Sequence, residues 1–245
     1  MIKVLLSGAC GHMGREIEKA VDNLDDVELV ARVDKFANES GCYNNFSDFD
    51  SKADVIIDFS NHLGTPELLD YAVRTGTPAV IATTGHTADE IKMIEAASEK
   101  IAVFHSANMS LGVALLIELA KKTASVMPEA DIEIVETHHH RKLDAPSGTA
   151  LMIANALTEI RKNAKLLLGR AGNAKRESNE IGIHAIRRGN IVGIHEVLVS
   201  TENQTITLKH EAHSRALFAD GAISAARFII GKPQGLYDMN SIISE

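Results

Sequence analysis

The chain has 245 residues, of which 45% are hydrophobic, enough for a sizeable core in one large domain or two small ones. Its formal net charge of -8 argues against a general nucleic-acid binder, because binding to phosphates needs a basic face. No segment approaches the roughly 18 apolar residues of a membrane span, and glycines interrupt the start too early for a signal peptide, so we expect a cytoplasmic protein without membrane contact.

The first part of the chain alternates short β-rich runs with helical stretches. Strands are predicted at residues 2–6, 27–33, 54–60, 78–83 and 101–105. Helices are predicted between them at residues 15–24, 67–74 and 88–100. This alternation is typical of a parallel sheet that is covered by helices.

The rhythm changes in the second half of the chain. A largely buried helix is predicted at 111–127, a half-buried strand at 130–136, a helix from about Thr149, and a mobile surface loop at 163–180. Three strands follow without intervening helices, at 181–186, 190–199 and 204–210. Consecutive strands of this kind favour an antiparallel or mixed sheet in a second domain. The helix predicted at 214–231 can pack back onto the first domain.

Three glycines, Gly8, Gly11 and Gly14, lie between the first predicted strand and the first predicted helix. Their spacing differs by one position from the common G-x-G-x-x-G fingerprint, but it still allows a tight turn and a close approach to a pyrophosphate. Asp34 ends the second predicted strand about 20 residues later, where a partner for a ribose hydroxyl is expected. Together these features favour a dinucleotide site over an ordinary turn. Asp34 favours NAD, whereas the adjacent Lys35 can pair with the 2′-phosphate of NADP, so both cofactors stay open.

The segment HHHRKLDAPSGTA, residues 138–150, concentrates positive charge in an acidic chain. Arg141 and Lys142 are cationic, and the histidines can donate protons near neutral pH. Ser147 is a good N-cap, and the N–H groups of the helix start at Gly148 would hold an anion. The segment therefore predicts a site for a small carboxylate. The alternatives are a charged surface loop that caps a helix, and a metal site, for which no ligand pattern is present.

The stretch EIVETHHHRKLDAPSGTA resembles the signature of the 4-hydroxy-tetrahydrodipicolinate reductase (dihydrodipicolinate reductase) family of the bacterial lysine and diaminopimelate pathway. Similar segments are GACGHMG, DFS, ATTG, SANMSLGV, RRGNIVGIHE and FADGAISAARFIIGKPQGLYDM, so that the resemblance runs from residue 4 to residue 239. It implies an α/β fold in which a Rossmann-like parallel-sheet nucleotide domain, 1–108 completed by 216–245, joins a smaller α+β substrate and oligomerisation domain, 109–215, with a mixed open sheet. It also implies hinges near residues 108 and 215, and a homotetramer.

The resemblance implies reduction of 4-hydroxy-tetrahydrodipicolinate, a small dicarboxylate, to tetrahydrodipicolinate with loss of water, using NADH, NADPH or both. It implies that His138 is the catalytic proton donor and that Lys142 assists it, while His139, Gly148 and Thr149 bind substrate. The implied cofactor contacts, with Lys35 added, are Gly8, Ala9, Cys10, Gly11, His12, Met13, Asp34, Lys35, Ala82, Thr83, Thr84, Ser106, Ala107, Asn108 and Met109. Family members often carry Arg at the position of His12, a departure that bears on the NADPH preference.

Two other functions share some of these features. Another NAD(P)-dependent amino-acid-type dehydrogenase would have the same glycine turn, and only residues 138–149 argue against it. A regulator that binds NADH without turnover should carry a basic recognition helix, which the sequence lacks. Of the isolated histidines, only His184 and His195 are candidates to face the substrate pocket, and the others are expected to be ordinary core or surface residues.

Overall fold

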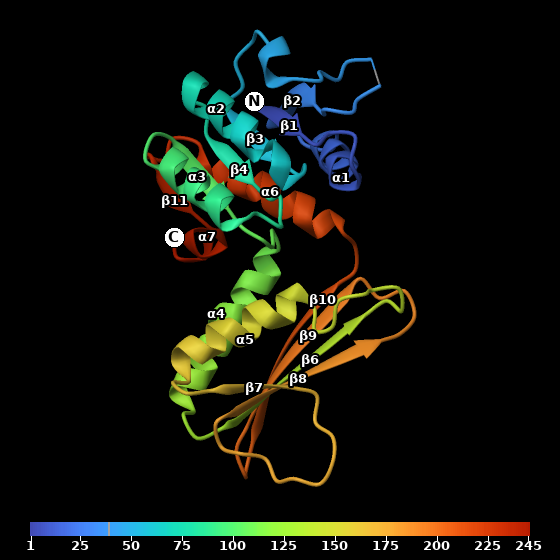
Figure 1. Cartoon of the computed structure of the whole chain (residues 1–245), viewed down its shortest axis with the longest axis vertical. Coiled ribbons are helices and arrows are strands. Elements are labelled where there is room, and N and C mark those ends of the chain that lie inside the picture. The colour runs from blue at the N-terminus through green and yellow to red at the C-terminus, as the bar shows by residue number, and fades with distance from the viewer. Residues whose placement is uncertain (39) are drawn as a thin grey trace. The chain divides into compact units, whose positions relative to one another are not determined.

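The chain folds into two compact units in a computed structural model that describes residues 1–38 and 40–245 (Figure 1). The first unit contains residues 1–111 and 215–245, and the second contains residues 112–214. The chain therefore leaves the first unit after one helix–strand series and returns to it for its last helices.

Six parallel strands form the sheet of the first unit, in the order β11-β5-β4-β3-β1-β2. They are β1 (Ile2–Ser7), β2 (Val27–Val33), β3 (Val55–Asp58), β4 (Ala79–Ile81), β5 (Ala102–His105) and β11 (Gly235–Tyr237). Most of their Val, Ile and Leu side chains are buried, as expected for strands covered on both faces, although Leu236 of β11 is 49% exposed. The five predicted strands are confirmed. The three-residue β11 was not predicted, because its register is supplied by β5 rather than by a pattern of its own.

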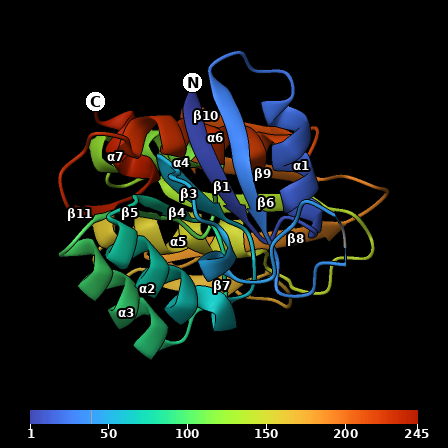
Figure 2. The same cartoon turned by 90° about the horizontal axis from the view of Figure 1, so that it is seen from above.

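Helices cover both faces of this sheet (Figure 2). Helices α1 (His12–Val21) and α6 (Ala216–Ile229) contact each other on one face, and α2 (Thr65–Thr75) and α3 (Ala88–Ser98) contact each other on the other face. A short α7 (Met239–Ile243) contacts α6, and two 3-10 turns lie at Phe46–Asp48 and His62–Gly64. Helix α1 starts before the predicted residue 15 because Gly11 serves as its N-cap. Helix α6 contacts β3, β4 and β5, so the prediction that it returns to this sheet is confirmed.

The second unit has a five-stranded sheet in the order β10-β9-β6-β8-β7. Its strands are β6 (Asp131–His138), β7 (Lys165–Leu168), β8 (Glu180–Arg187), β9 (Gly193–Ser200) and β10 (Thr205–Ala212). Strand β6 pairs antiparallel with β9 and parallel with β8, which confirms the prediction of a mixed sheet. Helices α4 (Leu111–Val126) and α5 (Gly148–Ile160) supply the other half of its core, and none of the described helices can cross a membrane.

The prediction of a mobile loop at 163–180 is wrong for Lys165–Leu168, which forms strand β7 beside β8. The segment is mostly polar, but it contains a short LLL run that pairs with the neighbouring strand β8. Four residues are too few to show a hydrophobic periodicity, so this pairing could not be predicted from the sequence. Arg176 ties the rest of this segment to β6, because its guanidinium contacts Asp131 at 2.7 Å and Glu133 at 3.2 Å.

Candidate active site

The order of the strands in the first unit identifies the edge of the sheet that can take a ligand. Strand β1 lies between β2 and β3, so the direction in which successive strands are added to the sheet reverses there. Open α/β sheets bind their ligands in the crevice at the carboxyl ends of the strands at such a switch point. Residues 8–11 follow β1 and residues 59–61 follow β3, so both segments lie at this point.

The glycines at this edge are required by the close approach of the backbone. Gly8 has a φ of +76°, and an added Cβ would lie 2.4 Å from the carbonyl oxygen of Phe59. At Gly14 a Cβ would lie 2.4 Å from the carbonyl oxygen of Ala9, so only glycine lets α1 pack against the turn. Gly11 caps α1 without a side-chain acceptor. The first N–H groups of this helix, together with its dipole, therefore fit the phosphates of a dinucleotide.

Asp34 is brought against the glycine turn by the end of β2. Its Oδ2 accepts a hydrogen bond from the N–H of Cys10 at 3.1 Å, and its Oδ1 accepts one from the N–H of Phe36 at 3.1 Å. Lys35 is exposed beside it. The sulfur of Cys10 lies 3.9 Å from that of Cys42, and both are free thiols. The predicted ribose acid and the predicted phosphate turn therefore form one continuous surface.

The remaining predicted cofactor segments, 82–84 and 106–109, follow β4 and β5 and so lie at the same edge. Thr83, which follows β4, links this segment to the end of β3 and to the segment after β3. Its hydroxyl donates to Asp58 at 2.6 Å and accepts from the N–H of Ser60 at 2.9 Å. Burial raises the pKa of Asp58. Four of the predicted cofactor residues have buried side chains, so a cofactor could contact mainly their backbone atoms: Ala9, Ala82, Thr83 and Met109.

In the second unit, alternate side chains of β6 face the interior, and some of them are polar. Ile132 and Ile134 face the core, and the next positions of the same register are Glu136 and His138. Glu136 has an exposure of 0% and His138 of 8%. Glu136 was not predicted from the sequence, although a carboxylate at an inward position of an alternating strand was a usable signal.

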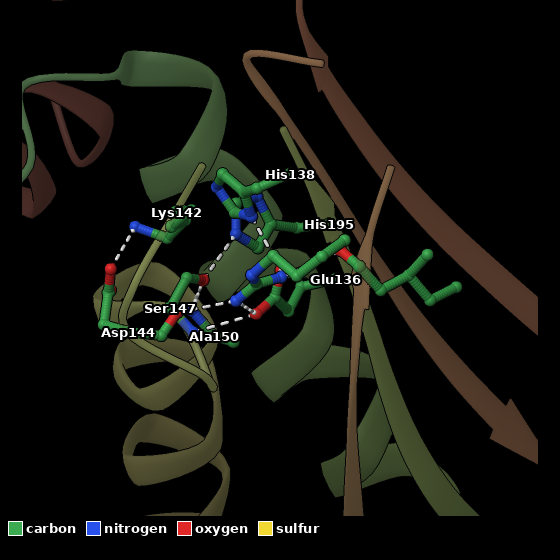
Figure 3. Close-up of polar contacts among 9 residues, drawn as sticks. Glu136, His138, Lys142, Asp144, Ser147, Ala150 and His195 are labelled. Carbon is green, nitrogen blue, oxygen red and sulfur yellow. Dashed lines mark hydrogen bonds and ion pairs between the residues drawn. The ribbon is translucent and has the colours of Figure 1, made fainter. Parts of the chain in front are cut away.

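Glu136 connects the elements of this site (Figure 3). Its Oε2 lies 2.6 Å from Nδ1 of His138, and its Oε1 accepts the N–H of Ser147 at 3.0 Å. Arg187 donates to both oxygens, at 2.7 Å each. Burial opposes the ionisation of Glu136, but the hydrogen bonds from His138, Arg187 and Ser147 outweigh it and lower the pKa to about 2. The carboxylate is therefore ionised at neutral pH.

His195 packs on the other side of this cluster. Its ring meets that of His138 edge-to-face, with centroids 5.2 Å apart, and its Nε2 lies 3.1 Å from the hydroxyl of Ser147. Burial, reinforced by His138, lowers the pKa of His195 to about 4, so this ring is neutral. His195, suggested from the sequence to face the substrate pocket, therefore lies beside His138. The same suggestion is wrong for His184, which pairs with Glu133 on the opposite face of β6.

The histidine run is fastened to the connection between β8 and β9. The N–H of His139 donates to the carbonyl of Ile191 at 2.8 Å, and Nδ1 of His140 lies 2.9 Å from the carbonyl of Gly189. Arg141 bonds to Asn190 at 2.5 Å. These contacts explain why sequence segments 138–141 and 189–191 form one loop pair, although about 50 residues separate them along the chain.

Lys142 and the start of α5 complete the site. Nζ of Lys142 pairs with Asp144 at 2.9 Å, and its charge contributes to the lowered pKa of His195. Ser147 is the N-cap, as predicted, and its hydroxyl accepts from the N–H of Ala150. A Cβ on Gly148 would meet nothing within 4 Å, so open space adjoins the helix start.

This geometry bears on the alternatives left by the sequence. A surface loop that only caps a helix would not bury Glu136, His138 and Ser147, so that interpretation is wrong. Among residues 1–38 and 40–245, no three His, Cys, Asp or Glu side chains are placed to hold a metal ion. What remains is a buried imidazole with an ionised partner, beside cations and a helix start.

Comparisons with known proteins agree along the whole chain. The family model described as dihydrodipicolinate reductase, N-terminus, matches residues 2–109, and that described as dihydrodipicolinate reductase, C-terminus, matches residues 112–243. A 4-hydroxy-tetrahydrodipicolinate reductase of Caldanaerobacter subterraneus subsp. tengcongensis is 44% identical over 100% of this chain and 99% of its own length. One from Clostridium novyi is 44% identical over 99% of this chain and 98% of its own length.

Two solved structures show the same fold. A dipicolinate-bound dihydrodipicolinate reductase from Paenisporosarcina sp. TG-14 has a TM-score of 0.81 at 24% identity, covering 98% of this chain and 99% of its own. A DAP dehydrogenase of C. glutamicum in complex with DAP has a TM-score of 0.60 at 13% identity, covering 97% and 92%. With both family models matched and relatives identical at 44% of positions, this chain belongs to the dihydrodipicolinate reductase family, whose members are NAD(P)H-dependent oxidoreductases.

Proposed function

We propose that this chain reduces 4-hydroxy-tetrahydrodipicolinate to tetrahydrodipicolinate, with loss of water, in lysine and diaminopimelate biosynthesis. One observation carries the proposal: a buried imidazole, His138, and the capped start of α5 at Ser147 are hydrogen-bonded to the same carboxylate. This joins a proton donor to an anion-holding helix end in one rigid cluster. The curated relatives carry the name of this activity.

Positive charge and open space at the start of α5 support the proposed binding of the substrate. The N–H groups at Gly148 and Thr149 take one carboxylate of the ring, helped by the positive end of the 13-residue α5. His139 and the cationic Lys142 contact the dicarboxylate nearby. Fixing the ring at two points reduces the entropic cost of bringing it to the reacting groups.

The cofactor side rests on the glycine turn of the first unit. The N–H groups of residues 8–13 would hold the pyrophosphate and Asp34 the adenine ribose, while residues 82–84 and 106–109 line the same edge. When bound, the reduced nicotinamide supplies a hydride. His12 and Lys35 are both exposed, so either can approach a 2′-phosphate, and we propose that the chain accepts both NADH and NADPH.

Proton transfer is the task of His138. Addition of a hydride to a conjugated imine leaves negative charge on a ring atom, which then takes a proton from the imidazolium. Because Nδ1 of His138 is occupied by Glu136, the proton comes from Nε2. The ammonium group of Lys142 stabilises the developing negative charge.

A coupled assay tests this function directly. The unstable substrate is generated in place, and oxidation of NADH and NADPH is followed separately. We expect His138→Gln to lower kcat by about 10²- to 10⁴-fold with a smaller change in KM. His184→Gln, a histidine on the other face of the same sheet, serves as the control. An unchanged kcat in His138→Gln, or turnover only with amino-acid substrates, would contradict the proposal.

We further propose that the protein acts in the cytosol as a homotetramer. Strand β10 supports the assembly, because it lies at an edge of the sheet and leaves most of its side chains exposed. Light scattering coupled to size-exclusion chromatography measures the mass directly, and a monomer of 26.4 kDa at working concentration would contradict this assembly.

A further inference from the structure

We infer that Glu136, clamped by Arg187, is the positioning residue that fixes the orientation and tautomer of His138 and leaves Nε2 as its proton-donating nitrogen. The inference rests on the proposed function, in which His138 donates a proton. Neither residue was singled out by the sequence, and Glu136 borders the proposed carboxylate site through its hydrogen bond with the N–H of Ser147.

The contact between Glu136 and His138 determines which ring nitrogen carries the fixed proton. The Nδ1 to Oε2 distance is 2.6 Å, and the carboxylate is ionised, so it can only accept. Nδ1 therefore keeps its hydrogen in the neutral and in the charged ring. Nε2 is left as the nitrogen that gains and loses the exchangeable proton.

Arg187 makes this carboxylate rigid. It lies opposite His138 in the pairing of β6 with β8, and it donates to both oxygens of Glu136. It also donates to the carbonyl of Asp144 at 2.7 Å, which fixes the guanidinium itself. A bidentate pair of this kind holds a carboxylate in one plane. Rotation of Glu136 away from the imidazole would break both bonds.

The same carboxylate sets the spacing between the proton donor and the anion site. Its second oxygen accepts the N–H of Ser147, the N-cap of α5. A movement of Glu136 would therefore displace His138 and the helix start together. This coupling distinguishes a positioning role from that of a simple buried ion pair.

The opposite side of His138 is shaped to keep Nε2 accessible. A Cβ at Gly193 would lie 3.1 Å from Nε2, so a larger residue there would crowd this nitrogen. His195 packs edge-on against the ring and stays neutral, so it does not repel an imidazolium. Glu136 and His195 contact His138, and Arg187 holds Glu136. Beyond them, His210 and Lys142 act electrostatically on His195, and Asp144 pairs with Lys142.

Strand β6 offers a matched control. Glu133 also accepts from a histidine and an arginine, His184 at 2.9 Å and Arg176 at 3.2 Å. It lies three positions before Glu136 and so faces the other side of the sheet. Replacing either glutamate by glutamine removes one negative charge and one histidine partner from the same strand.

The experiment compares Glu136→Gln with Glu133→Gln in the coupled assay. We expect Glu136→Gln to lower kcat by about 10²-fold while KM stays within about threefold of the wild-type value. The reason is that a neutral glutamine amide can hydrogen-bond to either tautomer of His138 and does not stabilise the imidazolium. Glu136→Asp should recover part of the rate. Glu133→Gln should stay within about twofold.

A measurement on the unaltered protein covers the case in which Glu136→Gln does not fold. Nitrogen-15 NMR of histidine-labelled protein, with His138 assigned by comparison with His138→Gln, reports which ring nitrogen is protonated. We expect the neutral ring to carry its hydrogen on Nδ1. A hydrogen on Nε2 would overturn the inference.

The outcomes separate the inference from the function beneath it. If His138→Gln keeps full kcat, the proposed proton donor is wrong. If His138→Gln loses activity but folded Glu136→Gln behaves like Glu133→Gln, the function stands and the positioning role is overturned. A fall in kcat that Glu136→Asp does not partly recover would also count against it, since it would indicate a structural role alone.

Discussion

The two helix starts that the sequence singled out solve the same physical problem in opposite ways. At α1 the anion site consists of backbone alone: a glycine cap, no side-chain acceptor, and glycines at every close approach. At α5 a serine caps the helix, and a buried carboxylate, an arginine and two histidines stand behind it. A bare backbone suffices to hold phosphates, whereas a group that must move a proton needs charged partners to orient it.

The strongest test of this comparison adds one methyl group to the first turn of α1, where the helix packs against the glycine turn. In Gly14→Ala the new Cβ would meet two carbonyl oxygens at 2.4 Å, so the turn must open. We expect a loss of about 3 kcal/mol in the free energy of unfolding and at least a 100-fold weaker NADH affinity. Denaturant unfolding and fluorescence titration measure the two effects. A variant with unchanged affinity would show that phosphates are not bound there.

The charged site at α5 should make stability depend on pH, which the glycine turn does not. The pKa of His195 is lowered from 6.5 to about 4, so its contribution is present above pH 6.5 and is lost as pH falls towards 4. This amounts to about 3 kcal/mol at most. Glu136, with its pKa lowered from 4.5 to about 2, contributes above pH 4.5 and loses that contribution down to pH 2.

Unfolding measured from pH 8 to pH 4 should show this decline, and His195→Gln should flatten it. A histidine outside the cluster, such as the exposed His12, provides the matched substitution, and His12→Gln should keep the wild-type slope. Equal slopes in all three proteins would mean that His195 is not held neutral by the fold.

Asp34 separates the ribose contact from the phosphate contact at the first helix start. Asp34→Ala should weaken NADH binding about tenfold and NADPH binding less, because the carboxylate accepts from the ribose hydroxyls but repels a 2′-phosphate. Titration with both cofactors measures the ratio. Equal losses would instead assign Asp34 to its hydrogen bond with the N–H of Cys10, a purely structural task.

The smallest expected effect is that of Gly148→Ala, the counterpart of Gly14→Ala at the second helix start. Its Cβ meets no atom within 4 Å, so the melting temperature should not change by more than about 2 °C. KM for the dicarboxylate should rise a few-fold, because the methyl group lies where the ring approaches. A lower melting temperature with unaltered KM would place the substrate elsewhere.

Much of this molecule was predictable from local pattern. The alternation of strands and helices up to residue 105 predicted the parallel sheet, and Ser147 predicted the start of α5 because N-capping is a short-range interaction. The proximity of Asp34 to the glycine turn followed from the geometry of a strand–helix–strand unit. Strands β7 and β11 were missed, since three or four residues carry no measurable period.

The amino-acid sequence by itself determined the two helix starts, the glycine turn and the family of the chain, because each depends on residues that are close together along the chain. Only the tertiary structure decided what surrounds His138. Arg187 and His195 reach it through the pairing of β6 with β8 and β9, from about 50 residues away along the chain. Strand register is a property of the folded sheet, so the partners that make a histidine a directed proton donor appear only when the strands align.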